Sequence, residues 1–336
     1  MKDYKNEIDF IVTWVDGNDP KWLEERKKYK ENSGTDTREE RFRDFGTIKY
    51  FFRSVEKFAP WVRKVYFVTE GHIPEWLNTD CEKLCVVKHE EFMPKEALPT
   101  FNSNAIEMNF HKINGLAEKF VYFNDDMLLL NSVSESDFFV EDKTKDMLAL
   151  QPVVANPNNP TMSSIMLNDS VVISRHFDKR QNIKSQKGNY FHIGYPLMYF
   201  VYNALELAFP LYTGFYTVHG PSPLLKSTYE EIWEKESDVL MQTTMNRFRS
   251  TEDVTQYLFR EWNKQKGNFV PANLHKMFKY IEVKNDTASY LPIIEKQKCK
   301  MVCINDTSKD LDYERVQKET LGALEKVFPD KCMFEK

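Results

Sequence analysis

The sequence has few cysteines, no excess of basic residues and no apolar stretch behind its N-terminal charges. Five cysteines in 336 residues, an odd number, suit a reducing compartment better than a disulfide framework. A formal net charge of −5 excludes the basic field that would make nucleic acid the main partner. The N-terminus, MKDYKNEIDFIVTWVDG, lacks the apolar core of a signal peptide. We therefore expect a cytoplasmic protein that does not bind nucleic acid.

Two cysteine pairs have C-x₃-C spacing, Cys81 with Cys85 and Cys299 with Cys303. Each pair leads into an apolar run typical of a strand, in which residues four apart are separated by about 13 Å. That distance is too long for two ligands of one metal ion, so a zinc site is disfavoured. We expect buried structural thiols instead.

Aromatic residues are abundant, at 14% of a chain that is 41% hydrophobic. This composition excludes intrinsic disorder and is sufficient for one large α/β domain or two smaller ones. The aromatic residues predict either an aromatic core or surfaces that stack on sugar rings or bases.

One stretch, YPLMYFVYNALELAFPLYTGFYTV at 195–218, carries a single formal charge, Glu206, in 24 residues. Pro196, Asn203 and Pro210 argue against a simple membrane-spanning helix, and the flanking residues show no clear positive bias. The favoured interpretation is a buried helix pair. A segment that lies on the surface and contacts lipid is the alternative.

Four short apolar runs each end at polar residues: IDFIVTWVDG, VRKVYFVTEG, KLCVVKHEEF and KFVYFNDD. Runs of this kind are typical of buried strands in a mostly parallel sheet. Apolar residues with helical spacing between 48 and 55 predict a crossover helix between the first two strands. A second helix is predicted in SNAIEMNFHKINGLAEK at 103–119, with Asn102 or Ser103 as its cap and Gly115 near its end.

These elements predict an α/β fold with a mostly parallel, Rossmann-like sheet of GT-A-like type, flanked by helices. Stretches rich in Pro and Asn mark the candidate boundaries of three parts. The parts are an α/β core at 1–150, a helical and aromatic insertion at 151–218, and a C-terminal portion at 219–336 that completes the site.

Asn124, Asp125 and Asp126 interrupt the apolar run KFVYFNDDMLLLNS. With Asp16 and Glu70 they would converge outside the carboxyl ends of the strands, where such sheets bind ligands. Two adjacent carboxylates held away from water cost several kcal/mol unless a cation or strong donors compensate them. Mg²⁺ or Mn²⁺ shared with substrate phosphates would do so, provided that the strand ends between the two side chains. The alternative is that one carboxylate only caps the following segment.

Four blocks of the sequence carry a resemblance to a known family. They are IDFIVTWVDGNDPKW at 8–22, a long block in two parts at 41–71 and 98–129, the block from HGPSP to RFRSTEDV at 219–254, and KMVCIND at 300–306 with the closing VFPDKCMFEK. The chain resembles the Stealth family of sugar-phosphate transferases in these blocks and in their order. That family contains bacterial capsule polymerases and the catalytic subunit of the lysosomal-enzyme N-acetylglucosamine-1-phosphotransferase.

The resemblance implies an enzyme that transfers hexose-1-phosphate from a UDP-sugar, of the UDP-GlcNAc, UDP-GalNAc or UDP-Gal type, to a hydroxyl of an acceptor saccharide. The products would be a phosphodiester and UMP, in the biosynthesis of a capsule or cell-surface polysaccharide. One alternative is a metal-dependent glycosyltransferase that releases UDP, which would not need the block with His219 and Arg249. The other is a carbohydrate-binding protein without turnover, which would leave that block and the Asp pair unexplained.

The resemblance also implies which residues bind the metal. Asp125 and Asp126 of the second block would hold Mg²⁺ or Mn²⁺, and Asp126 would thereby take part in catalysis. Asp306 of the fourth block would be a further ligand, and Asn305 beside it would contact the substrate.

Catalytic roles are implied for three further residues. Asp16 would lie near the nucleotide or the reacting phosphate. His219 would be the general base, because the pKa of an imidazole suits work near neutrality. Arg249 would bind phosphate oxygens through its planar fork, and Arg247, two residues away, is a second candidate for substrate binding.

Weaker candidates for substrate binding are Arg43, for the pyrophosphate, and Asn102 and Asn104, for the sugar or base. For these three the alternative is an ordinary cap or a surface charge. Glu107 and His111 lie four residues apart and are expected to form a supporting pair on one helix face.

One block departs from the family pattern. HGPSP stands where many members have His-Thr-Pro-Tyr-Pro, so the histidine and both prolines are kept. Residues 151–218 match no family block, and we expect acceptor choice to be determined there. The aromatic run at 195–218 makes a lipid-linked acceptor a hypothesis, with the protein peripheral on the inner face of the plasma membrane.

Overall fold

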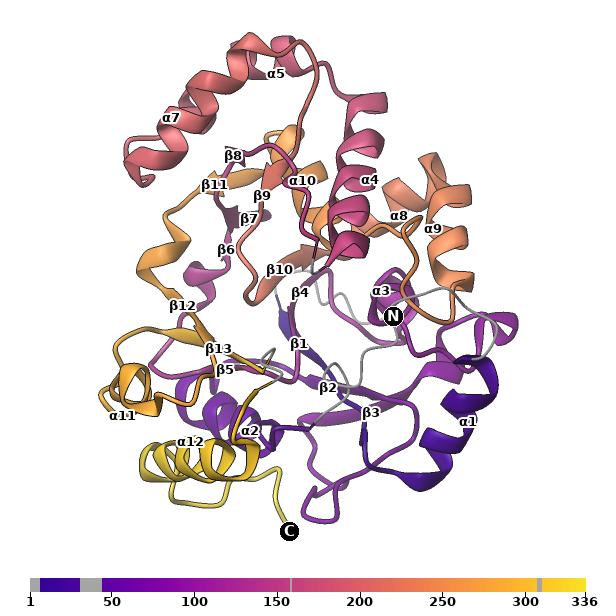
Figure 1. Cartoon of the computed structure of the whole chain (residues 1–336), viewed down its shortest axis with the longest axis vertical. Helices are drawn as coiled ribbons and strands as arrows, with labels where there is room; N and C mark the ends of the chain where they lie inside the picture. The colour runs from indigo at the N-terminus through magenta and orange to yellow at the C-terminus, as the bar shows by residue number, and fades with distance from the viewer. Residues whose placement is uncertain (1–6, 31–43, 158, 307–309) are drawn as a thin grey trace.

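The computed structural model describes residues 7–30, 44–157, 159–306 and 310–336 (Figure 1). Its central sheet has five strands in the order β10–β4–β1–β2–β3. Four of them are parallel, and the fifth, β10 (Ser222–Leu225), runs antiparallel to β4 at the edge of the sheet. The parallel strands are β1 (Ile8–Thr13), β2 (Val65–Thr69), β3 (Leu84–Lys88) and β4 (Lys119–Phe123). The four predicted strands and the mostly parallel α/β fold are confirmed.

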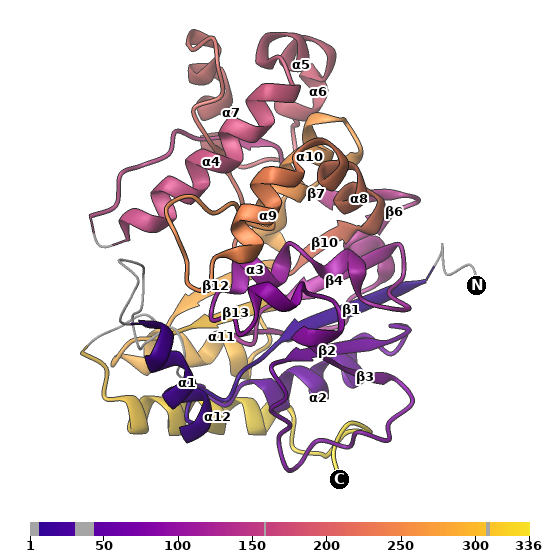
Figure 2. The same cartoon turned by 90° about the vertical axis from the view of Figure 1, so that its right-hand side faces the viewer.

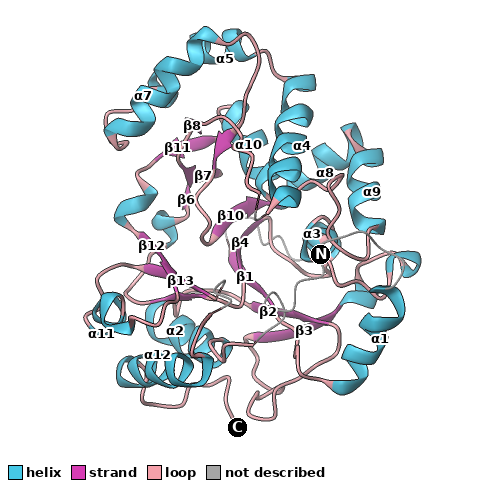
Figure 3. Ribbon diagram, in the orientation of Figure 1, coloured by secondary structure: helices cyan, strands magenta, loops and turns pink. Residues whose placement is uncertain are grey.

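Helices cover both faces of this sheet (Figure 3), because successive side chains of a strand point to opposite sides. Phe10 and Val12 of β1 share one core with α2 (Ile48–Phe58). Ile11, between them, belongs to a second core with α8 (Lys226–Lys235) and α10 (Tyr257–Gln265). The crossover helix predicted between the first two strands is therefore confirmed as α2.

The helix predicted at 103–119 is much shorter in the structure. α3 covers Ser103–Glu107, and only a 3₁₀ turn, η4 (Phe110–Lys112), follows it. Asn102 caps α3 as predicted, since its side chain accepts from the backbone N–H of Asn104. The Asn109 amide donates to a backbone carbonyl of α3 at 2.8 Å. It thus competes with the next helical hydrogen bond, and the chain turns away.

A second sheet brings the C-terminal part of the chain to the end of β4. β4 stops at Phe123, residues 124–126 lie between strands, and β5 (Met127–Leu129) follows. β13 (Met301–Asn305) pairs antiparallel with β5 and parallel with β12 (Phe278–Glu282). β4 thus ends at Phe123, before both carboxylates and not between them, and the sharing of one metal ion by Asp125 and Asp126 stays a prediction.

Residues beyond 150 take part in the same sheets as the N-terminal ones, since β10 pairs with β4 and β13 with β5. The insertion also joins a sheet, since Phe215–Tyr216 pair with Ala149–Leu150, so the three predicted parts share their sheets and their exact boundaries stay predictions. The remaining strands are β6 (Phe139–Val140), β7 (Lys143–Asp146), β8 (Ala149–Leu150), β9 (Phe215–Tyr216) and β11 (Phe269–Pro271). Further helices are α1 (Pro20–Lys30), α9 (Ser237–Met245), α11 (Leu291–Glu295) and α12 (Tyr313–Val327).

The insertion at 151–218 is helical, as predicted. Figures 1 and 2 place its outer helices at one end of the long axis, opposite α12. The buried helix pair predicted at 195–218 is wrong, because α7 is followed only by the 3₁₀ turn η6 (Glu206–Ala208) and its outer face is exposed. Among the helices that the structure describes, none has the length and apolarity to cross a membrane. The helices of the insertion are α4 (Pro160–His176), α5 (Lys179–Ser185), α6 (Lys187–Tyr190) and α7 (Leu197–Leu205).

Candidate active site

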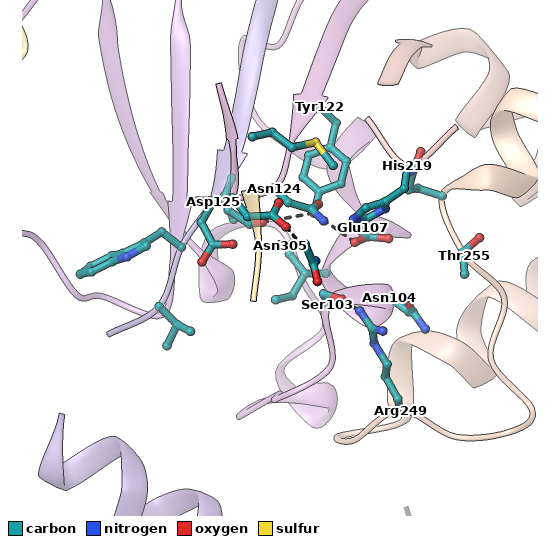
Figure 4. Close-up of a pocket in the computed structure, with 18 of the residues that line it drawn as sticks. Ser103, Asn104, Glu107, Tyr122, Asn124, Asp125, His219, Arg249, Thr255 and Asn305 are labelled. Carbon is teal, nitrogen blue, oxygen red and sulfur yellow. Dashed lines mark hydrogen bonds between the residues drawn. The ribbon is translucent and has the colours of Figure 1, made fainter. Parts of the chain in front are cut away.

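A cavity of about 620 Å³ opens at the carboxyl ends of the parallel strands (Figure 4). Its volume lies in the range of small-molecule binding sites. All four sequence blocks contribute to its lining, including most of the residues predicted for the site. The predicted residues that line it are Glu70, Asn104, Asn124, Asp125, Asp126, His219, Arg249, Asn305 and Asp306.

Asp125 and Asp126 lie on the turn after β4, which two other elements hold in place. Thr47, at the start of α2, donates its hydroxyl to the backbone carbonyl of Asp125 at 2.7 Å. The N–H of Ile304 in β13 donates to the carbonyl of Asp126 at 2.8 Å. Burial, together with the negative charges of Asp126 and Asp44, raises the pKa of Asp125 to about 8. A cation beside this turn would restore the carboxylate, since a positive charge favours the ionised form.

The side chain of Asp126 is the centre of a polar cluster. Its Oδ2 accepts from Cys303 Sγ at 3.1 Å and from Asn305 Nδ2 at 3.0 Å. In the part of the chain that the structure describes, Oδ1 of Asp126 and Oδ1 of Asn305 are buried without a hydrogen-bond partner. Ligand atoms of Asp126, His219 and Cys303 lie within 4.8 Å of one another. Only one of these three ligand atoms is an oxygen, and Asn305, which is hydrogen-bonded to Asp126, adds a second oxygen that a hard cation could use.

His219 lies in the loop between β9 and β10. Its Nδ1 is 2.6 Å from the hydroxyl of Tyr257. Burial lowers the pKa of the imidazole below its usual 6.5, although the carboxylate of Asp126 acts in the opposite direction. The neutral form, which a general base requires, is therefore favoured near pH 7. The residue after His219 is Gly220. A Cβ at that position would lie 2.8 Å from the ring of Phe278, so a larger residue would clash there.

Arg249 reaches the cavity from the loop after α9. Its Nη2 donates to Oγ of Ser103, the first residue of α3, at 2.7 Å. Glu107, the last residue of α3, accepts from the hydroxyl of Tyr122 at 3.0 Å. Burial raises the pKa of Glu107 to about 7, against the effect of the positive charge of Arg249. Arg249, Ser103 and Glu107, all labelled in Figure 4, thus bring to the cavity a guanidinium, a hydroxyl and a carboxyl that titrates near neutrality.

Some predicted site residues do not line the cavity. The carboxylate of Asp16 accepts from a backbone N–H two residues further on, within a turn. Asn102 is fully buried and donates to Asp253 at 2.8 Å. Arg247 donates to two backbone carbonyls of the segment before α3. Arg43 lies outside the described residues, so its role and those of the other three stay predictions.

Two residues have surroundings that the sequence did not indicate. Cys303 is a buried thiol, as expected, but it contacts Asp126 in the cavity wall. The supporting pair of Glu107 and His111 is wrong, because α3 ends at Glu107 and the His111 ring packs near Trp233 at 5.7 Å between centroids. The sequence signal for Cys303 is its spacing of two from Asn305, which puts both on one face of a strand.

Aromatic side chains also line the cavity. Trp14, Trp22, Phe45 and Phe101 all line it. Glu70 lies there as predicted, with Oε2 2.6 Å from Nδ1 of His89, which follows β3 and was not singled out in the sequence. Aromatic faces beside polar groups suit a ligand that contains rings.

Two sequence profiles of one family match this chain. The profile of Stealth protein CR1, conserved region 1, matches residues 6–34. The profile of Stealth protein CR2, conserved region 2, matches residues 41–147. The first two blocks of the resemblance lie inside these matched regions.

Curated proteins match over nearly the full length of the chain. The capsular polysaccharide phosphotransferase WcwK of Streptococcus pneumoniae is 39% identical, over 98% of this chain and 99% of its own. The receptor polysaccharide phosphotransferase WefC of Streptococcus oralis is 38% identical, over 98% of this chain and 99% of its own. The exopolysaccharide phosphotransferase cps2G of Lactiplantibacillus plantarum is 36% identical, over 98% of this chain and 96% of its own.

Solved structures are more distant. The galactosyltransferase LgtC, in complex with donor and acceptor sugar analogues, has a TM-score of 0.39 and 11% identity, over 94% of this chain and 95% of its own. The glycosyltransferase GlyE of Streptococcus pneumoniae has a TM-score of 0.38 and 10% identity, over 95% of this chain and 64% of its own. A likeness of this size adds no argument about function.

Proposed function

Because the chain belongs to the Stealth family, together with the polysaccharide phosphotransferases that it matches, we propose that it transfers a sugar-1-phosphate in bacterial polysaccharide biosynthesis. The donor is a UDP-sugar of the UDP-GlcNAc, UDP-GalNAc or UDP-Gal type, and the acceptor is a hydroxyl of an oligosaccharide. The products are a phosphodiester and UMP. The observation that carries this proposal is the convergence of Asp126, His219 and Arg249 in one cavity from two separate blocks of the sequence.

In the proposed step, the acceptor hydroxyl oxygen attacks the phosphorus that carries the sugar. A new O–P bond forms, the bond from this phosphorus to the bridging oxygen breaks, and UMP leaves with that oxygen. His219 takes the hydroxyl proton at Nε2, in the tautomer whose Nδ1–H donates to the hydroxyl of Tyr257. Arg249 and Ser103 face the phosphoryl oxygens on which charge accumulates. The bond between the sugar and its phosphate stays intact.

The residues around Asp126 fit Mg²⁺ or Mn²⁺. Buried acceptors without a donor are costly, and Oδ1 of Asp126 and Oδ1 of Asn305 are two such atoms among the described residues. Carboxylate and amide oxygens are the ligands that hard divalent cations prefer. Burial raises the pKa of the Cys303 thiol well above its usual value, and the thiol donates to Asp126. A bound ion would neutralise charge on the diphosphate.

The proposal includes the place of action. The enzyme works in the cytoplasm on a lipid-linked acceptor, at the inner face of the plasma membrane. The insertion supports an acceptor site in the cavity. It lies outside both matched regions of the family, yet it supplies Asn159, Met162 and Thr217 to the lining. Family-specific residues and insertion residues thus meet at one site, as a shared donor and a variable acceptor would require.

The nucleotide product tests this proposal. We expect purified protein, incubated with a panel of UDP-sugars, Mg²⁺ and candidate oligosaccharides, to release UMP, separable from UDP by anion-exchange chromatography. Reactions without acceptor distinguish transfer from hydrolysis, and reactions with a chelator test the metal. UDP as the only nucleotide product would identify a glycosyltransferase and contradict the proposal.

A further inference from the structure

The outer surface of the insertion is apolar around α7. Ile193, Leu197, Leu205 and Leu211 are 98%, 78%, 62% and 68% exposed. Leu197, Val201 and Leu205 recur every four residues, so they form one stripe along the helix. We call the exposed apolar side chains of residues 193–211 the apolar cap. An exposed apolar surface of this extent marks a site of interaction.

The inner face of α7 is polar. Asn203 is buried and donates to two backbone carbonyls, at 2.6 and 3.1 Å. The hydroxyl of Tyr199 is 3.0 Å from Nε2 of His275, and Glu206, just after the helix, pairs with Lys179 at 2.6 Å. A helix between water and a protein core has the opposite arrangement, with apolar residues inward and polar residues outward. The polarity of α7 therefore suits an apolar environment outside the protein.

Positive charge accompanies the apolar cap. Residues 179–215 contain four basic residues and one acidic residue, Glu206, in a chain whose net charge is −5. Lys179 neutralises Glu206, and both side chains are buried. The other three basic residues, Arg180, Lys184 and Lys187, are exposed on α5 and α6. Figures 1 and 2 place α5 and α7 at the same end of the molecule.

We propose that the apolar cap docks on an anionic phospholipid bilayer, with Arg180, Lys184 and Lys187 beside the headgroups. Apolar side chains with a basic border have the chemistry of a segment that lies in a membrane interface. A second copy of this chain is a poorer occupant, because a symmetric contact would bring the same positive border against itself. The contact with the bilayer is argued independently of the proposed function. Only its purpose, access to a lipid-linked acceptor, rests on that function.

α4 connects the cavity to the end of the molecule that carries the apolar cap. Asn159 and Met162, at its start, line the cavity, and its last residue, His176, lies three residues before α5. Its 17 residues span about 25 Å at 1.5 Å per residue. The glycan of a lipid-linked acceptor would have to span a distance of at most this order to reach the cavity along α4.

Vesicle co-sedimentation tests the docking without any substrate. We expect the full chain to sediment with vesicles of phosphatidylglycerol and phosphatidylcholine, and much less with phosphatidylcholine alone or at high salt. The triple variant Leu197→Ser, Val201→Ser, Leu205→Ser should lose at least tenfold in binding. A matched variant, Ile73→Ser, Met241→Ser, Met245→Ser, changes exposed apolar residues elsewhere and should bind like the parent.

Several outcomes would overturn the proposal. They are a parent chain that does not bind, equal binding by both triple variants, or a dimer in sedimentation velocity that only the first variant dissociates. Unchanged melting temperatures exclude misfolding, since all six side chains are exposed. Transfer to a water-soluble oligosaccharide should be the same in parent and variants. Failure of the proposed function would appear as UDP release or no turnover, whatever the vesicles show.

Discussion

Burial sets the protonation states of three side chains that share the cavity. It lowers the pKa of His219 and raises those of Glu107 and Asp125 to about 7 and about 8. Each shift favours the neutral form, because a cavity with little water penalises charge. The neutral imidazole suits a base, whereas a neutral Asp125 would be a poor ligand. A bound divalent cation would reverse the preference at Asp125, so its charge and the metal are coupled.

Variants of His219 and Asp126 should separate proton transfer from cation binding. We expect His219→Ala to lower kcat by about 10² to 10⁴, the usual contribution of a general base, with little change in the KM for the donor. Asp126→Asn should instead raise the Mg²⁺ concentration needed for half-maximal rate. Steady-state rates over a Mg²⁺ series measure both effects. Normal kinetics in both variants would refute the assigned roles, and Asp80→Asn is the comparison, since Asp80 is exposed and is not among the residues that line the cavity.

Glu107 should make stability depend on pH. Its pKa is about 7 in the folded chain against an ordinary value of 4.5. Between these values the unfolded chain loses the proton first, so the stability of the parent falls as pH rises. The amide side chain that Glu107→Gln introduces cannot titrate. The free energy of unfolding of this variant, relative to that of the parent, should therefore rise by about 3 kcal/mol between pH 4 and pH 8. Urea unfolding at both pH values measures this difference, which should be absent for the exposed Glu252→Gln.

At the scale of elements, α10 holds the loop that carries His219. Its Arg260 forms two hydrogen bonds with Asp146 of β7, both at 2.8 Å, and both side chains are fully buried. The same guanidinium donates to the carbonyl of Val218 at 3.0 Å. The residue before the base is therefore fixed by an ion pair between two elements, while the hydroxyl of Tyr257 at the start of α10 orients the imidazole.

Breaking this ion pair should be costly. Asp146→Ala leaves the guanidinium of Arg260 buried without its partner, and we expect a loss of about 3 to 5 kcal/mol in the free energy of unfolding. Glu231→Ala is the matched control, because it removes a partly exposed ion pair with Lys266 at the end of α10 and should cost less than about 1 kcal/mol. Urea denaturation measures both. Equal losses would contradict this role of the buried pair.

At the scale of the whole molecule, residues far apart in sequence close the sheets and the cores. β10 adds to β4, β13 adds to β5, and α12 shares a core with α2. Near the C-terminus, Glu335 accepts from Nε and Nη2 of Arg53 in α2, at 2.7 and 3.1 Å, and is buried. The N-terminal half of the fold therefore depends on the last residues of the chain.

A fragment of residues 1–150 should not fold by itself. It lacks β10 and β13, so the edges of β4 and β5 are unpaired, and it lacks α12 of one core and α8 and α10 of the other. Far-UV circular dichroism and limited proteolysis should show an unfolded or aggregated fragment. Co-expression with residues 151–336 is the control and should restore a folded complex. A fragment that unfolds cooperatively at the melting temperature of the full chain would contradict this expectation.

The strands, the crossover helix and the family could be predicted because their signals are local. A buried strand needs a continuous apolar run, and IDFIVT, VYFVT, LCVVK and KFVYF each provide one within a few residues. The acidic turn is equally local, since Asp125 and Asp126 follow such a run directly. His219 and Arg249 came from consecutive matches in one block of the resemblance, and both line the cavity.

Tertiary structure decided the rest, because contacts between distant residues override local preferences. Asp126 meets Cys303 across 177 positions, a pairing that exists only once β13 lies beside β5. Asp16 follows its strand as closely as Asp126 follows β4, yet the turn after β1 directs it out of the cavity lining. α7 has an apolar composition that predicts burial, but Asn203 and Glu206 find their polar partners inside, so the apolar side chains remain outside.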